Sequence, residues 1–272
     1  MRFPSRAPLE ASSATEGLVG EGHEPATNHM DKGSAVRDMF DTIAARYDRA
    51  NTVMTGGIDA WWRRQAAASL SLATDAHVLD LCCGTGALTR ELVRHVPQGH
   101  VTGVDFSSQM LAAARARGGP GNIRYEQADV LQLPFPAGSF DAATMAFSMR
   151  NVTDIGACLR ECARVLKPGG SFVNLEVGKP ENPLLRRAFY LYFYGVIPAL
   201  GGLVGGDRAA YRYLPQSLIN FPDARALAGL FKDNGFPHTR CVFLMGGVAN
   251  MHIGTTPLPS GVTQPALASA LS

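Results

Sequence analysis

Short apolar runs alternate with helical segments through the middle of this chain. HVLDLCC and HVTGVDF each contain an aspartate, and each precedes a segment with apolar residues at helical spacing, 86–95 and 107–116. IRYEQAD, FDAATMAF and SFVNLEV continue the series, and a helix is expected over DIGACLRECARVL. This alternation predicts right-handed βαβ units, a parallel sheet and helices on both faces. Ligands are then expected at the carboxyl ends of the strands.

The last part of the chain does not follow this alternation of strands and helices. In TRCVFLMGGVANMHIG, two β-rich runs flank Gly246 and Gly247, a pattern typical of a two-residue hairpin. We therefore expect the sheet to finish with an antiparallel pair. Apolar residues at helical spacing predict two further helices ahead of the sheet, over 36–45 and 60–70.

Composition limits the classes of function. With 272 residues, 46% of them hydrophobic, the chain can bury one large α/β core. Its 25 basic and 23 acidic side chains nearly balance, so it lacks the charge that a nucleic-acid-binding surface requires. The odd count of 5 cysteines favours a reducing, cytoplasmic compartment. Cys158 and Cys162 lack a second pair of zinc ligands, so we expect buried core residues and no metal site.

The two ends of the chain differ in composition from its centre. Residues 1–34 contain scattered Pro, Gly, Ser and charge without an apolar secretory signal, which predicts a disordered leader. Residues 257–272 are rich in Pro and Ser, which predicts a flexible tail. One folded domain is therefore expected over 35–256.

An uncharged stretch at 188–206 raises the question of a membrane span. Its length is marginal against the ~20 apolar residues that a span requires, and Pro198 and the Gly201-Gly202 pair interrupt a helix. We therefore favour an interfacial helix or lid bearing aromatic side chains, within a helical insertion at 184–222 that covers the substrate. A buried core helix is the alternative.

A glycine turn between a strand and a helix indicates the ligand. The nicotinamide fingerprint requires a third glycine where HVLDLCCGTGALTREL has Thr89, so an NAD-dependent reductase is disfavoured. S-Adenosylmethionine has no pyrophosphate, and Gly84 and Gly86 let its methionine end and sugar approach the backbone. Asp105, 19 residues after Gly86, is spaced to accept hydrogen bonds from both ribose hydroxyls, although that spacing alone fits NAD equally well.

This order of elements resembles the class I S-adenosylmethionine-dependent methyltransferases. The resemblance implies a Rossmann-like α/β fold with a mostly parallel seven-stranded sheet and an antiparallel terminal hairpin. It also implies that Asp129 accepts from the adenine amine while the next backbone N–H meets the ring. Asp80, Gly84, Gly86, Asp105, Asp129 and Asp141 form an ordered set along the chain. The alternative role of Asp80 is to cap a loop, and that of Asp141 is to orient a strand turn. The cofactor-binding residues expected on this basis are Asp80, Cys82, Gly84, Thr85, Gly86, Asp105, Phe106, Met110, Asp129, Val130 and Ala146.

Five segments carry a closer resemblance: YDRANTVMTGGIDAWW, FSMRNVTD, RVLKPGGSFVNLEVGKP, YRYLPQSLINFP and LMGGVANMH. Together, over 36–254, they resemble the UbiE/MenG/COQ5 family of quinone-biosynthesis C-methyltransferases. The resemblance implies methylation of a ring carbon of demethylmenaquinol or 2-methoxy-6-polyprenyl-1,4-benzoquinol. FSMRNVTD also lacks the Asn/Asp-Pro-Pro-Tyr cluster that nucleobase amine methylation requires, and no catechol-type metal set is evident. The chain departs from the family's usual residues at Ala50, Thr55, Asp59, Ala87, Val177 and Gly178.

The resemblance also implies catalytic roles. Arg150, just past the fourth strand, would stabilise phenolate charge, and Asn151 would hold the hydroxyl or a relay water. His252 and Tyr47 are further candidates, with a structural histidine as the alternative. The aromatic region 189–213 would cover the prenyl chain. A lipophilic quinol substrate predicts peripheral contact with the inner face of the membrane, and the choice between monomer and homodimer stays open.

Two rival hypotheses remain at this stage. An enzyme that methylates another small phenolic or lipid acceptor would keep the cofactor site and lose only the quinone pocket. A non-catalytic protein would bind S-adenosylhomocysteine without turnover.

Overall fold

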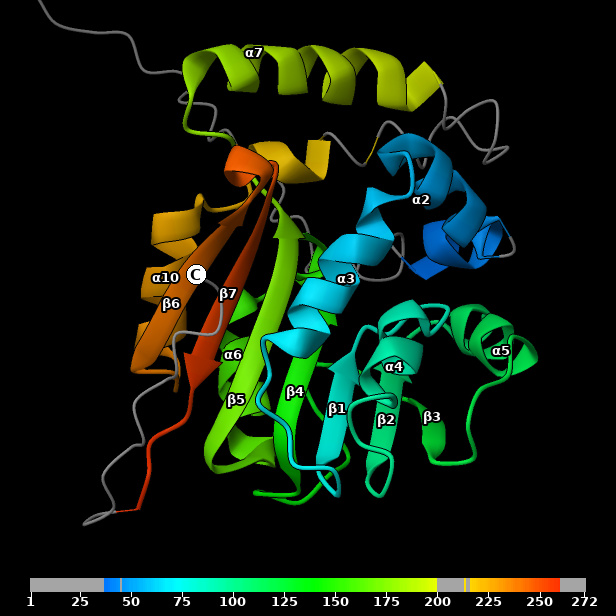
Figure 1. Cartoon of the computed structure of the whole chain (residues 1–272), viewed down its shortest axis with the longest axis vertical. Helices are drawn as coiled ribbons and strands as arrows, with labels where there is room; N and C mark the ends of the chain where they lie inside the picture. The colour runs from blue at the N-terminus through cyan, green and yellow to red at the C-terminus, as the bar shows by residue number, and fades with distance from the viewer. Residues whose placement is uncertain (1–36, 45, 200–212, 214–215, 260–272) are drawn as a thin grey trace, which may run out of the picture.

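A computed structural model describes residues 37–44, 46–199, 213 and 216–259. These residues form a seven-stranded sheet in the order β3-β2-β1-β4-β5-β7-β6. Strands β1 to β5 are parallel, and β7 lies antiparallel between β5 and β6 (Figure 1). The strands are β1 (His77–Leu81), β2 (His100–Asp105), β3 (Ile123–Gln127), β4 (Phe140–Ala146), β5 (Leu166–Val177), β6 (His238–Leu244) and β7 (Ala249–Thr255). This topology confirms the expected fold.

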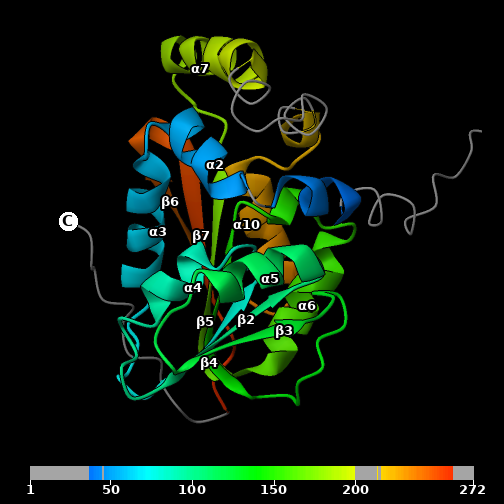
Figure 2. The ribbon, with the colours of Figure 1, turned by 90° about the vertical axis from the view of Figure 1, so that its right-hand side faces the viewer.

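Helices cover both faces of the sheet. Helices α3 and α4 pack on one face and α6 and α10 on the other (Figure 2). The named helices are α2 (Tyr47–Thr55), α3 (Ile58–Ala68), α4 (Ala87–Leu92), α5 (Ser108–Ala116), α6 (Ile155–Val165), α7 (Pro183–Tyr190) and α10 (Ala224–Asp233). A further helix covers 37–43. Shorter helical elements are the 3-10 turns η1 (Met149–Asn151) and η3 (Met245–Gly247) and the π-helix η2 (Leu191–Val196).

Apolar packing on both faces leaves the strand ends as the places where polar side chains can meet a ligand. On the α6 and α10 face, Phe172 stacks on Phe231 with ring centroids 5.4 Å apart and packs against Phe236 at 5.6 Å. On the other face, Trp62 of α3 and Leu88 and Leu92 of α4 are buried in a separate apolar cluster. The strand order reverses at β1: β2 and β3 lie on one side of it, and β4 and β5 lie on the other. The connections that leave these strands therefore diverge, and a crevice opens at the carboxyl end of β1.

The predicted two-residue hairpin at Gly246-Gly247 is wrong. Leu244 pairs with Ala249, so the connection is the four residues from Met245 to Val248. Met245, Gly246 and Gly247 adopt φ values of 49°, 66° and 94°, and these left-handed conformations turn the chain over a longer path. Two consecutive glycines indicated the turn but did not define its length.

Several expectations concern the ends of the chain and the apolar stretch. The expected leader lies outside the described residues, as do 260–272 of the expected tail and 200–206 of the uncharged stretch. Residues 188–199 are helical. Among the residues that the structure describes, no helix is both long enough and apolar enough to cross a bilayer.

Candidate active site

A cavity of about 1080 Å³, including its part open to solvent, lies at the carboxyl ends of β1, β2 and β4. It is lined by every expected cofactor-binding residue except Gly86. Tyr47 and Asn151 also line it, so the structure brings the predicted cofactor residues together with two of the four predicted catalytic residues. The other two, Arg150 and His252, lie outside this lining.

The glycine turn provides the bare backbone that the sequence predicts. Gly84 and Gly86 adopt left-handed φ values of 55° and 76°. A Cβ on Gly86 would lie 2.2 Å from the Tyr125 hydroxyl, so no side chain fits there and Gly86 instead serves as the N-cap of α4. A Cβ on Gly84 would meet no atom within 4 Å, because the turn faces the cavity at this position. A ligand can therefore approach the backbone at Gly84.

Asp105 is held against the glycine turn by two backbone donors. The N–H of Gly84 donates to Oδ2 at 2.8 Å, and the N–H of Ser107 donates to Oδ1 at 2.9 Å. Burial raises the pKa of Asp105 to about 6, although these hydrogen bonds oppose the shift. An ionised carboxylate has about four acceptor positions, so each oxygen can still accept one hydroxyl of a bound ligand.

Thr89, at the position of the third glycine of the nicotinamide fingerprint, has a side chain that forms a buried hydrogen bond. Its hydroxyl donates to Asp80 Oδ2 at 2.6 Å, and the Thr144 hydroxyl donates to Oδ1 at 2.7 Å. Burial raises the pKa of Asp80 to about 6. Asp80 therefore anchors the strand to the following helix and also lines the cavity, and its contact with a ligand stays a prediction.

The remaining two aspartates of the ordered set lie at opposite ends of the sheet. Asp129 is exposed, lines the cavity and accepts the Leu131 N–H at 2.9 Å. Asp141 begins β4 at the far edge, where it accepts from the His77 N–H at 2.9 Å and from Lys167 Nζ at 2.6 Å. Asp141 therefore orients the strand end and is remote from the cavity.

The N-terminal helices contribute cavity residues that the sequence reasoning missed. Asp48 accepts from the Thr85 hydroxyl at 2.5 Å and pairs with Arg117 at 3.0 Å, which fixes α2 against the glycine turn. Asp41, which does not line the cavity, accepts from the Ser107 hydroxyl. These carboxylates lie far from the turn in sequence, and helical periodicity carries no signal for such contacts.

Two of the departures from the family pattern are hydrogen-bonded to each other. The Thr55 hydroxyl donates to Asp59 Oδ1 at 2.8 Å, and Asp59 also forms an ion pair with Arg63. Arg63 lines the cavity, and its guanidinium lies 5.3 Å from the centroid of the Phe147 ring. The two departures therefore position a cationic side chain at the site.

The half of the cavity beside η1 carries phenol and amide groups. The Oδ1 atom of Asn151 is buried without a hydrogen-bond partner within the described part of the chain. Burial raises the pKa of Tyr47, while a hydrogen bond with Asn51 and the charge of Arg150 oppose the shift. At neutral pH Tyr47 is therefore a protonated hydrogen-bond donor. The free Asn151 oxygen and the Tyr47 hydroxyl match the needs of a hydroxylated ligand.

Arg150 forms a buried ion pair with Glu176 of β5, and the side chains are only 4% and 2% exposed. These exposures exclude an ordinary surface pair. Glu176 also accepts the Val177 N–H at 2.9 Å, and burial raises its pKa although Arg150 lowers it. Sequence reasoning missed Glu176, because its position in an apolar strand gives no sign of which cation it meets.

His252 lies in β7 beside a smaller cavity of about 240 Å³, including its part open to solvent. Its Nε2 is 2.8 Å from the carbonyl oxygen of Ala224, which can only accept, so Nε2 carries the proton. Burial lowers the pKa of His252, and its Nδ1 is buried without a partner in the described structure. His252 is therefore a neutral imidazole with a free acceptor nitrogen.

Cys158 and Cys162 are buried free thiols on the face of α6 that packs against the sheet. Burial raises the pKa of both thiols, which disfavours the thiolate form that binds metals. Within 37–44, 46–199, 213 and 216–259, no group of three His, Cys, Asp or Glu side chains could hold a metal ion.

Comparison with solved structures places the fold. A putative methyltransferase in complex with the Haloferax volcanii Trm112 activator aligns with a TM-score of 0.60 and 20% identity, over 80% of this chain and 97% of that chain. A Thermotoga maritima S-adenosylmethionine-dependent methyltransferase aligns equally well, at a TM-score of 0.60 and 19% identity, over 80% of this chain and 98% of that chain. At such low identity these likenesses show the fold alone.

Sequence relatives are closer. A demethylmenaquinone methyltransferase of Deinococcus radiodurans is 43% identical over 239 residues, which cover 87% of this chain and 99% of the relative. The ubiquinone/menaquinone biosynthesis C-methyltransferase UbiE of Teredinibacter turnerae is 40% identical over 84% of this chain and 94% of its own length. The model of the ubiE/COQ5 methyltransferase family matches residues 27–256.

The residues present fit the methyl donor of this family. Asp105 offers two acceptor positions for a ribose, Gly84 leaves space for close approach, and Asp80 and Asp129 add acidic groups to the cavity. The family match, the relatives and this cavity lead to one conclusion. The chain belongs to the ubiE/COQ5 methyltransferase family and is an S-adenosylmethionine-dependent methyltransferase.

Proposed function

We propose that this protein transfers a methyl group to a ring carbon of a polyprenyl quinol in menaquinone or ubiquinone biosynthesis. The observation that carries the proposal is that the free Asn151 oxygen and the protonated Tyr47 line the same cavity as the predicted cofactor residues. A phenolic hydroxyl can donate to Asn151 and accept from Tyr47. The names of the relatives, a demethylmenaquinone methyltransferase and an enzyme of both quinone pathways, support this substrate class.

The donor half of the cavity would hold S-adenosylmethionine, which supplies a methyl group on a positively charged sulfur. Asp105 accepts from the ribose hydroxyls, while Asp129 and the Val130 N–H meet the adenine. Asp80 places negative charge near the turn, where it complements a cationic ligand end. The residues of this half bind and orient the donor, which lowers the entropic cost of an in-line displacement.

The acceptor half would make the quinol ring nucleophilic. A free phenol has a pKa of about 10, so the site must favour the phenolate at neutral pH. Tyr47 donates to the developing oxyanion, and Asn151 holds the hydroxyl or a water beside it. The charge of Arg150 lies close enough to Tyr47 to lower its pKa, so it also favours negative charge on a neighbouring ligand.

The assay that tests this function uses purified protein, labelled S-adenosylmethionine and short-chain quinols kept reduced. We expect label on the ring carbon of demethylmenaquinol, of the methoxybenzoquinol, or of both, and the comparison identifies the preferred ring. Asn151→Ala should lower kcat by about 100-fold, the usual effect of removing one group that stabilises an oxyanion. Asp141→Asn, at the far edge of the sheet, is the control and should retain the wild-type rate.

Two results would contradict the proposal. One is methylation of other phenols or lipids without any methylation of quinols, which would favour a different acceptor. The other is tight binding of S-adenosylhomocysteine without turnover of any acceptor, which would favour a non-catalytic protein.

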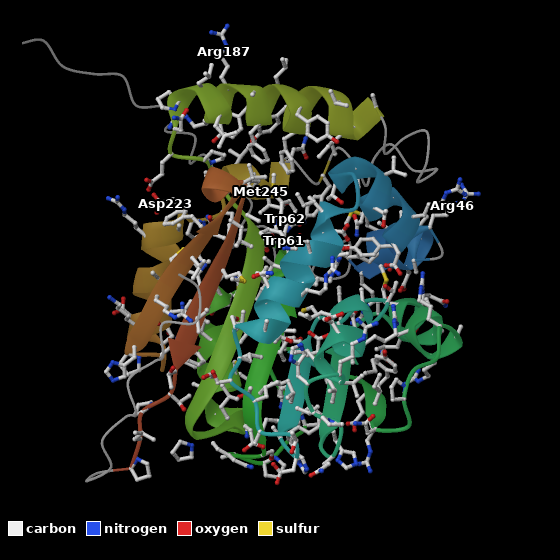
Figure 3. All side chains as sticks on the ribbon, in the orientation of Figure 1. Arg46, Trp61, Trp62, Arg187, Asp223 and Met245 are labelled. Atoms are coloured by element: carbon white, nitrogen blue, oxygen red, sulfur yellow. The ribbon has the colours of Figure 1, made fainter. Side chains whose placement is uncertain are left out.

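We further propose that the outer face of α7 and η2 meets a lipid surface from which the prenyl chain enters. Phe189 and Phe193 point into the core, whereas Leu184 and Leu191 are 79% and 75% exposed. Helix α7 crosses above the carboxyl ends of the strands, and Arg187 projects from it away from the molecule (Figures 1 and 3). Apolar side chains beside an arginine suit the boundary between acyl chains and anionic headgroups.

The lipid contact has a direct test. Leu184→Ser combined with Leu191→Ser should reduce co-sedimentation with anionic vesicles several-fold and raise KM for a long-chain quinol. The KM for a short-chain quinol in solution should not change. If the wild type and the double variant bind vesicles equally, the proposed lipid contact is wrong. The result of the quinol assay would still stand.

A further inference from the structure

Four polar residues occupy one face of the β5 and β7 pair, which lie side by side in Figure 1. Asn174 pairs with His252 in the strand register, and Glu176 pairs with Asn250. Because residues two apart on a strand share a face, all four side chains project from the same side of the sheet. Their exposed fractions are 0%, 1%, 5% and 1% for Asn174, Glu176, Asn250 and His252. We call these four residues the polar row.

The polar row has more hydrogen-bonding capacity than the protein satisfies. Both polar side-chain atoms of Asn174, Oδ1 of Asn250 and Nδ1 of His252 are buried without a partner in the described structure. The Nε of Arg150, which is paired with Glu176, is also without a partner there. Buried polar atoms are nearly always bonded to protein or to ordered water, so a cluster of this kind is a site for bound water.

A cavity connects the polar row to the surface. The cavity of about 240 Å³ beside His252 is lined by Glu176 and Asn250 on its inner side and by Lys179 and Asp223 on its outer side. Asp223 is exposed to solvent. On its other side Glu176 contacts Arg150, which adjoins Asn151 in the lining of the main cavity. Glu176 therefore lies between the proposed quinol site and a path to solvent.

Methylation of a ring carbon releases a proton that such a path can carry to solvent. The new C–CH3 bond forms as the S–CH3 bond breaks and its electron pair stays on sulfur. The ring C–H bond then breaks to restore aromaticity, so each turnover releases one proton. Tyr47 is already protonated, and the Asp48 carboxylate, which lies against the glycine turn, is bonded to Thr85 and Arg117.

Resting on the proposed function, we propose that Glu176 accepts the proton released in each turnover, through a water held by Asn151, and that the hydrated polar row passes it to solvent. Within the row, Nδ1 of His252 is the unpartnered atom that can take up a proton, because Nε2 donates to Ala224 and amide oxygens are not basic. The charged and titratable groups around this path are Arg150 on the substrate side and Lys179 and Asp223 at its outer end, with Tyr47 and Tyr213 within reach of the Arg150 charge.

The kinetic test compares variants of the full chain in the quinol assay across neutral and alkaline pH. Glu176→Gln keeps the side-chain volume but cannot take up a proton, and we expect kcat to fall about 100-fold with KM and S-adenosylhomocysteine affinity unchanged. Glu176→Asp should recover part of the rate, since it restores a carboxylate. His252→Asn should cause a smaller loss that diminishes as pH rises, because hydroxide then removes the proton.

Thr255→Val is the matched control. Thr255 lies on the same strand with a buried hydroxyl that has no partner in the described structure, and it does not line the smaller cavity. Its replacement should leave kcat unchanged. If Glu176→Gln and His252→Asn lower kcat only in proportion to a loss of folded protein, the polar row is structural and the proposal is wrong. If Glu176→Gln does not fold, the pH dependence of kcat in His252→Asn decides between the two. A loss that diminishes as pH rises supports the proposal, and a loss that does not change with pH contradicts it.

A spectroscopic measurement keeps this inference separate from the substrate assignment. In protein with 15N-labelled histidine, Nδ1 of His252 should resonate as an unprotonated acceptor, and Glu176→Gln should shift that resonance whereas Thr255→Val should not. If the His252 Nδ1 resonance does not shift in Glu176→Gln, the proposal that Glu176 and His252 share a water network is wrong. If wild-type protein methylates no quinol, the proposed function fails, yet this measurement still decides whether Glu176 and His252 are connected.

Discussion

Asp105→Asn is expected to weaken binding of S-adenosylhomocysteine by about 100-fold. A hydrogen bond to a charged group contributes about 1.5–3 kcal/mol, and in the proposed function both ribose hydroxyls would donate to this one carboxylate. An asparagine has only one acceptor oxygen, and its amide would oppose the N–H of Gly84 or Ser107. Two donors facing each other cost further binding energy.

Isothermal titration calorimetry measures this loss directly. Asp141→Asn removes a carboxylate from the opposite edge of the sheet, where it pairs with Lys167, and should bind as tightly as wild type. Circular dichroism establishes that both variants are folded. Unchanged affinity of Asp105→Asn would show that the nucleoside lies elsewhere in the cavity.

Affinity should also depend on pH through the same carboxylate. The pKa of Asp105 is raised from 3.8 to about 6, so protonation removes an acceptor as the pH falls through about 6 and the affinity decreases. For folding the sign is opposite. A carboxyl whose pKa is raised in the folded state contributes stability that is fully present below 3.8 and lost as the pH rises through about 6. Asp105→Asn should reduce both dependences, and Asp80, whose pKa is also raised to about 6, accounts for the part that remains.

The second large effect concerns the buried pair. Arg150→Met leaves the Glu176 carboxylate without its cation in an apolar environment, and we expect the free energy of unfolding to fall by about 3–5 kcal/mol. Adding Glu176→Gln removes the stranded charge, so the double variant should regain most of the lost stability. Neither variant should methylate a quinol, because both lack the charge that favours the phenolate.

Urea unfolding of wild type, both single variants and the double variant completes the cycle. The expected coupling between the two positions is strongly favourable, and kcat is measured in parallel. A double variant as unstable as Arg150→Met would show that the guanidinium stabilises the fold through contacts other than Glu176. A catalytically competent double variant would remove Arg150 from the proposed mechanism.

Local sequence determined the sheet and which residues gather around the glycine turn. Alternating apolar runs and helical segments predicted βαβ units, and the parallel order then brings Gly84, Asp105 and Asp129 to one edge. Asp105 ends β2, and Gly84 and Asp129 lie in the loops that follow β1 and β3. Because a strand end and its first loop residues are adjacent in sequence, their joint position is readable from spacing alone. The hairpin length was not readable in this way, since register depends on cross-strand pairing.

Only the tertiary structure decided which charges meet. Arg150 was singled out as a group that favours the phenolate. It lies in η1 after β4, and its partner Glu176 in β5 became evident only when β4 and β5 were placed side by side. Asp48 reaches the glycine turn from a helix far away in sequence, and His252 faces a separate cavity. Contacts between distant residues depend on the packing of whole elements, and burial then decides whether a charged side chain has a partner, a shifted pKa or a water.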